Sequence, residues 1–105
     1  MNELLRTPGF TGKDVFNAAS ALKLSDQVGC EINVTDLYVA EKPDKDGVSV
    51  VSACLKDETG TIYATISQSI IGQVYGLVEL LPCTVTVITK KSINEDREYY
   101  MLELI

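Results

Sequence analysis

The chain has 105 residues, the length of a single domain, and 46% of them are hydrophobic, which is too apolar for a disordered protein. Fifteen acidic and nine basic residues give a net charge of −6, which excludes duplex nucleic-acid binding by bulk positive charge. The sequence contains no histidine, so histidine-dependent base catalysis, a Ser-His-Asp triad and histidine metal ligation are excluded.

The cysteines and the N-terminal residues bear on the cellular compartment in which the protein is expected. Cys30, Cys54 and Cys83 fit no C-x-x-C zinc or redox spacing, and their odd number argues against a disulfide framework. The first residues lack the pattern of a signal peptide, and no apolar run is long enough for a membrane span. We therefore expect a cytoplasmic protein with no membrane partner. No catalytic, metal or cofactor motif stands out, so we expect no enzymatic activity, no metal and no cofactor.

Residues 1–29 are predicted to form an N-terminal extension. Turn dipeptides occur at residues 8–9 and 11–12, and the segment at 18–22 is short for a helix. Phe10 and Phe16 are the expected apolar anchors that fasten this extension to the rest of the domain.

Three strands are predicted after the extension. Residues 30–35 alternate between apolar and polar side chains, and the alternation slips at residues 36–37, which indicates a bulge. Residues 48–55 are β-branched and apolar. Residues 61–66 alternate again after a hairpin loop in which Gly60 can adopt a positive φ.

A helix and two more strands complete the predicted order. The helix begins after Ser67, a good N-cap, and ends near Leu81 because Pro82 follows. Strands are predicted at residues 84–90 and 98–104. Five strands with one helix between the third and fourth is the element order of an OB-fold barrel. We thus expect a mainly β, five-stranded OB-fold barrel over residues 30–105, with the extension packed on it.

An OB barrel holds single-stranded nucleic acid or oligosaccharide on the face of its second and third strands and between the loops that join strands 1–2 and 4–5. Binding a single strand requires aromatic rings for stacking and cations along the backbone path. Tyr63 is the first aromatic candidate, because it lies opposite Ile62 and Ile66, which we expect in the core. Tyr38, at the end of the first strand, is a second.

Tyr99 is a third candidate, because Tyr100 shares its face with two leucines and is expected to point into the core. The basic residues of the two loops are the expected phosphate contacts: Lys42, Lys45, Lys90, Lys91 and Arg97. Acidic residues are interleaved with them, so a solvated loop surface is the alternative interpretation.

One helix face carries only small or neutral side chains: Ser69, Gly72, Gln73 and Gly76. Such a face allows close approach of another backbone. Self-association and packing against the N-terminal extension are the two interpretations, and both stay open.

Several pieces of the chain carry a family resemblance. They are Val15-Phe16-Asn17-Ala18, Leu24-Ser25-Asp26 before Gly29, Gly60-Thr61-Ile62-Tyr63-Ala64-Thr65-Ile66-Ser67 after Asp57, Val85-Thr86-Val87, Lys90-Lys91-Ser92 and Leu102-Glu103-Leu104. With them the sequence resembles the small single-stranded-DNA-binding proteins of tailed bacteriophages, including those that serve protein-primed replication.

The resemblance implies an OB fold that coats and protects single-stranded DNA, without strong sequence preference, during phage replication or recombination in the host cytoplasm. Replication proteins are then expected partners, and Tyr63 is expected to line the DNA path. The loop at residues 93–97 departs from the family because it is acidic and lacks glycine. The chain ends in its last strand without an acidic tail, so tail-mediated recruitment is not expected.

Two other functions remain open. The acidic charge also suits an OB-like protein-interaction module that binds no nucleic acid, such as a phage inhibitor of a host factor. An oligosaccharide-binding barrel is the weaker alternative because few aromatic residues are available to support it.

Overall fold

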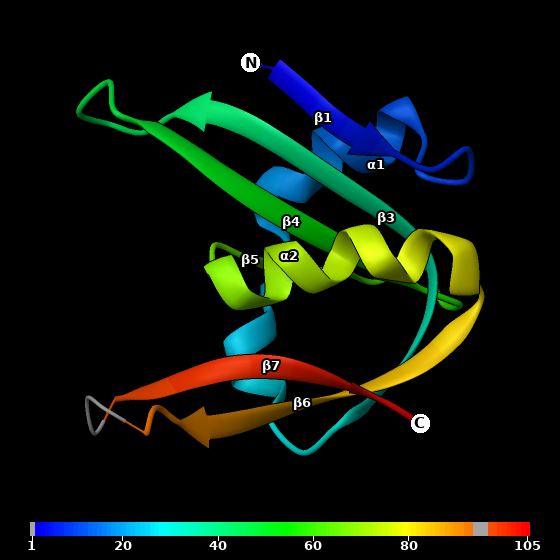
Figure 1. Cartoon of the computed structure of the whole chain (residues 1–105). Helices are drawn as coiled ribbons and strands as arrows, with labels where there is room; N and C mark the ends of the chain where they lie inside the picture. The colour runs from blue at the N-terminus through cyan, green and yellow to red at the C-terminus, as the bar shows by residue number, and fades with distance from the viewer. Residues whose placement is uncertain (1, 94–96) are drawn as a thin grey trace.

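The computed structural model describes residues 2–93 and 97–105 and is mainly β (Figure 1). In chain order the elements are β1 (Asn2–Arg6), α1 (Gly12–Asn17), the 3-10 turn η1 (Ala18–Ser20), β2 (Leu22–Lys23), the 3-10 turn η2 (Leu24–Gln27), β3 (Glu31–Pro43), β4 (Ser49–Asp57), β5 (Ile62–Thr65), α2 (Gln68–Leu77), the 3-10 turn η3 (Val78–Leu80), β6 (Cys83–Lys91) and β7 (Glu98–Leu104).

The strands form one curled sheet in the order β2-β5-β4-β3-β6-β7, and β1 pairs separately with β3. The long strand β3 connects the two halves, since its first residues pair with β6 and its later residues pair with β4. The register of the β3–β4 pair shifts between Val34 and Asp36, which confirms the predicted bulge to within a residue. A bulge bends the strand and increases its twist, which suits the point where the sheet curls.

The predicted mainly β architecture is confirmed, but the sheet is not a closed five-stranded barrel. Among the described residues no backbone pairing joins β7 to β5, so the sheet is an open half-barrel with a seam between these two strands. Figure 1 shows α2 between the β3–β4 hairpin and the β6–β7 hairpin, on the concave side of the sheet.

Helix α2 begins as predicted but is shorter. The Ser67 hydroxyl accepts a hydrogen bond from the Ile70 amide at 3.5 Å, and the regular helix ends at Leu77, followed by the turn η3. Nothing lies within 4 Å of a methyl group built on Gly72 or Gly76, so the small-residue face is not covered by the N-terminal segment.

Two hydrophobic clusters stabilise the fold. The larger lies between the concave sheet face and α2, and its fully buried members include Leu24, Val34, Leu37, Val39, Leu55, Ile70, Val74, Val85 and Val87. The smaller lies on the opposite face, beneath the N-terminal segment, and consists of Phe10, Tyr38, Ala40, Cys54 and Ile62. The sheet therefore has apolar packing on both faces.

The N-terminal segment is fastened by side chains as well as by the β1–β3 pairing. Lys56 Nζ donates to the Asp14 carboxylate at 2.7 Å and to the Gly9 carbonyl at 3.1 Å. Phe10 is buried, which confirms its role as an apolar anchor. Phe16 is 83% exposed, so the prediction that it is a second anchor is wrong.

Candidate nucleic-acid interface

Tyr38 does not offer an open ring face on which a base could stack. It is only 4% exposed and stacks on Phe10, with ring centroids 4.9 Å apart and an interplanar angle of 6°. Burial, followed by the negative charge of Glu3, raises the pKa of the Tyr38 phenol. The prediction of base stacking at Tyr38 therefore fails, because Phe10 already occupies a face of the ring.

The two faces of β5 are the reverse of the prediction. Tyr63 packs against the larger core cluster, and its hydroxyl donates to Asp57 Oδ2 at 3.5 Å. Burial, with Asp57 adding to it, raises the pKa of Tyr63. Ile62 belongs to the smaller cluster, while Ile66 is 68% exposed. Alternation could not assign the faces, because the strand has apolar neighbours on both.

On β7 the tyrosine that reaches the open space is Tyr100 rather than Tyr99. Tyr100 is 36% exposed and shares a face with the buried Leu102, whereas Tyr99 is half-buried and pairs with Lys90. Tyr100 lies on the face of β7 that was predicted, but helix α2 does not cover its side chain. A helix of ten residues is about 15 Å long, whereas a strand of seven residues spans about 23 Å, so one end of β7 extends beyond the helix.

All five predicted phosphate contacts are exposed: Lys42, Lys45, Lys90, Lys91 and Arg97. They belong to the β3–β4 and β6–β7 hairpins, and the end of β3, the start of β4, the end of β6 and the start of β7 lie at the same end of the molecule (Figure 1). Asp44, one of the interleaved acids, has a structural role, since its carboxylate accepts from the amides of Asp46 and Val48 at 2.8 and 2.9 Å. Residues 94–96 of the second loop lie outside the described residues.

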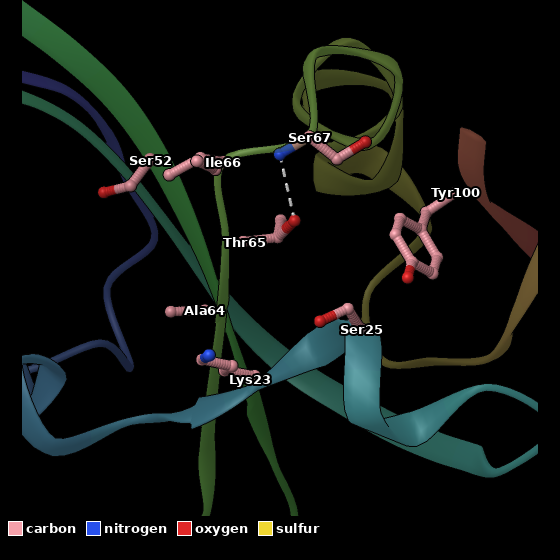
Figure 2. Close-up of a pocket in the computed structure, with 8 residues that line it drawn as sticks. All are labelled: Lys23, Ser25, Ser52, Ala64, Thr65, Ile66, Ser67 and Tyr100. Atoms are coloured by element: carbon pink, nitrogen blue, oxygen red, sulfur yellow. Dashed lines mark hydrogen bonds between the residues drawn. The ribbon is translucent and has the colours of Figure 1, made fainter. Parts of the chain in front are cut away.

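A pocket of 480 Å³ opens at the seam between β5 and β7, and we call it the seam pocket. It is lined by Lys23, Ser25, Ser52, Ala64, Thr65, Ile66, Ser67 and Tyr100. Figure 2 shows Tyr100 and Ser25 on one side of β5 and Ser52 and Ala64 on the other, so the pocket wraps around the end of this strand. The Thr65 hydroxyl accepts from the Ser67 amide at 3.0 Å, which fixes the turn from β5 into α2.

A second pocket, of 240 Å³, lies between the N-terminal segment and the outer sheet face, and we call it the cover pocket. It is lined by Val15, Ala18, Tyr38, Ala40, Lys42, Ser52, Cys54, Ala64 and Ile66. The two pockets share Ser52, Ala64 and Ile66, so they adjoin one another, and we call the pair the groove. The groove is lined by two lysines and, within the described part of the chain, by no carboxylate.

The groove thus brings together Lys42, Lys23 and Tyr100, of which Lys42 was predicted. Tyr38, which was also predicted, lines the cover pocket with one face of its ring on Phe10, whereas Tyr63 lies in the packing. Lys23 carried no sequence signal, because it reaches the groove through β2, a two-residue strand that pairs in parallel with Tyr63 and Ala64.

The described residues contain no group of three or more cysteine and acidic side chains that could hold a metal ion. Among the same residues, no helix has the length and apolar character needed to cross a membrane.

A comparison of the chain with protein-family models, with curated proteins and with solved structures finds no match.

Proposed function

We propose that this protein binds single-stranded DNA without strong sequence preference, as a non-enzymatic, OB-like protein that protects the strand during phage DNA replication or recombination in the host cytoplasm. The observation that carries the proposal is the groove. In a chain with six more acidic than basic residues, the described residues of its lining include Lys23, Lys42 and the ring of Tyr100 but no acid. A local cationic path beside an exposed ring is the combination that single-strand binding requires.

The open seam and the two basic hairpins support this proposal. In the OB-like element order, β4 and β5 are the second and third strands, and the groove crosses their outer face beside the seam. The N-terminal segment covers the rest of that face. The single-stranded DNA therefore follows the part that is left open, from Tyr100 past Ile66 toward Lys42. The hairpins carrying Lys45 and Lys90 flank this path.

The energetics imply binding of moderate strength. Stacking on one tyrosine contributes roughly 1–3 kcal/mol per base. If about two to four phosphates are neutralised, log K falls with log salt concentration with a slope of about −1.5 to −3. The net negative charge keeps this number of contacts small.

The test is a titration of labelled oligo-dT with the protein, followed by fluorescence anisotropy at several salt concentrations. Tyr100→Ala should weaken binding by about 5- to 150-fold. Tyr75→Ala is the matched control, because Tyr75 is an exposed tyrosine on α2 that lines neither pocket. Absence of salt-dependent binding by the folded protein at micromolar concentration and low salt would contradict the proposal.

A protein-interaction module is the second candidate, and exposed apolar side chains favour it. Phe16 and Ile93 are 83% and 99% exposed, respectively, and the chain is acidic. Such a module binds no oligonucleotide at any salt concentration, so the same titration separates the two functions.

A further inference from the structure

The cover pocket has the size of a site for one small ring. Its 240 Å³ lies below the range of roughly 300–1,000 Å³ that holds a drug-sized ligand. One wall comes from the N-terminal segment through Val15 and Ala18, and the floor comes from the outer sheet face through Ala40, Cys54 and Ala64. These side chains are small and apolar, so the pocket suits a flat group of limited size.

Among the described lining residues, the charged group of the pocket is a donor, and the hydroxyl groups of Ser52 and Tyr38 can donate or accept. Lys42 reaches it from β3 and can only donate hydrogen bonds, and Ser52 adds a hydroxyl from β4. The positive charge of Lys42 also acts on Cys54 in the floor of the pocket. Burial raises the pKa of the Cys54 thiol to about 11, and the charge of Lys42 opposes this rise. Of the described residues that line the pocket, none is an aspartate or glutamate that could accept from an amino group.

We propose that the cover pocket binds one thymine base of the single strand that lies in the seam pocket. Thymine offers carbonyl oxygens, which accept from Lys42 and Ser52, and a C5 methyl group, which packs on apolar side chains such as Val15. Cytosine instead carries an amino group at C4, which would face the ammonium of Lys42, so donor would meet donor.

The inference rests on the proposed function, because the base arrives as part of the strand. The two pockets share Ser52, Ala64 and Ile66, so a strand whose base stacks on Tyr100 passes directly over Ile66 into the cover pocket. One such site in a longer footprint produces a modest preference among bases, compatible with binding to any sequence.

The experiment compares oligo-dT, oligo-dU and oligo-dC of about 12 nucleotides by anisotropy, a length within the range of single-strand site sizes. We expect oligo-dT to bind about fivefold more tightly than oligo-dC, with oligo-dU between them because it lacks the methyl group. In Lys42→Met the ratio of dT to dC affinity should fall to about the ratio of dT to dU affinity, because only the contribution of the C5 methyl group remains.

Lys45→Met is the matched control. Lys45 is exposed in the same hairpin and lines neither pocket, so its loss removes the same charge and should weaken all three oligonucleotides equally while keeping the ratio. Equal affinity for oligo-dT and oligo-dC, or an unchanged ratio in Lys42→Met, overturns the thymine site but leaves single-strand binding intact. Failure of every oligonucleotide to bind overturns both.

Discussion

Gln73 on α2 forms hydrogen bonds with the outer edge of β7. Its side-chain carbonyl accepts from the Leu102 amide at 2.7 Å, and its side-chain NH₂ donates to the Leu102 carbonyl at 2.8 Å. β7 is the last strand of the sheet, so these two bonds replace the neighbouring strand that a closed barrel would supply. They also hold Tyr100, two residues away, opposite the end of β5.

Replacing Gln73 with alanine should therefore destabilise the fold well beyond an ordinary surface substitution. Each lost hydrogen bond contributes about 1 kcal/mol, and the two polar groups of the buried Leu102 are left without their partner. Allowing for partial access of water to the strand edge, we expect a loss of about 2–4 kcal/mol in the free energy of unfolding. That is a large part of the roughly 5–15 kcal/mol typical of a domain.

The assay is urea denaturation followed by far-UV circular dichroism, because the chain contains no tryptophan for fluorescence. Gln68→Ala is the control, since Gln68 is an exposed glutamine in the first turn of the same helix. Its free energy of unfolding should stay within about 0.5 kcal/mol of the wild type. If Gln73→Ala is equally mild, the two bonds do not stabilise β7 and the reasoning is refuted.

Two further substitutions test how the N-terminal segment is held. Gly9→Ala places a methyl group against the Asp36 carboxylate and should cost about 1–3 kcal/mol, whereas Gly12→Ala, which has open space, should be nearly neutral in the same urea assay. Lys56 lowers the pKa of Asp14, so the pair stabilises the fold above the ordinary carboxyl pKa of 3.8, and this stabilisation is lost as the pH falls through the lowered value. The gap in urea midpoint between wild type and Lys56→Met should therefore shrink between pH 5 and pH 2, and a gap independent of pH would count against the pair.

The order of the central elements was predictable because a local periodicity of side chains marks them. The alternation in β3 and the apolar stripe of α2 gave their positions, and the slip near Asp36 gave the bulge. Strand β1 was missed for the opposite reason. Its residues are mostly exposed, and only pairing with β3 makes it a strand, through contacts such as Arg6 with Tyr38. Nothing in a local pattern reports such a pairing.

The candidate site was harder to predict, because it depends on what other segments cover. Tyr63 and Tyr38 have the right residue type for stacking, yet Tyr63 packs on the larger core cluster and Tyr38 lies beneath Phe10. Lys23 and Tyr100 are distant in sequence. They line the same pocket only because the sheet stays open at the seam.

Two features, the N-terminal segment on the outer sheet face and Gln73 at the edge of β7, explain why the sequence prediction of the site was wrong. They also define the candidate site. The N-terminal segment covers much of the outer face, so binding that used the whole face would require Phe10 to leave a buried stack and Lys56 to leave Asp14. Gln73 occupies the edge of β7, so closing the barrel would require those two bonds to break first. Both changes cost free energy without any ligand. The proposed single-stranded DNA needs neither change if it binds in the groove, from Tyr100 to Lys42.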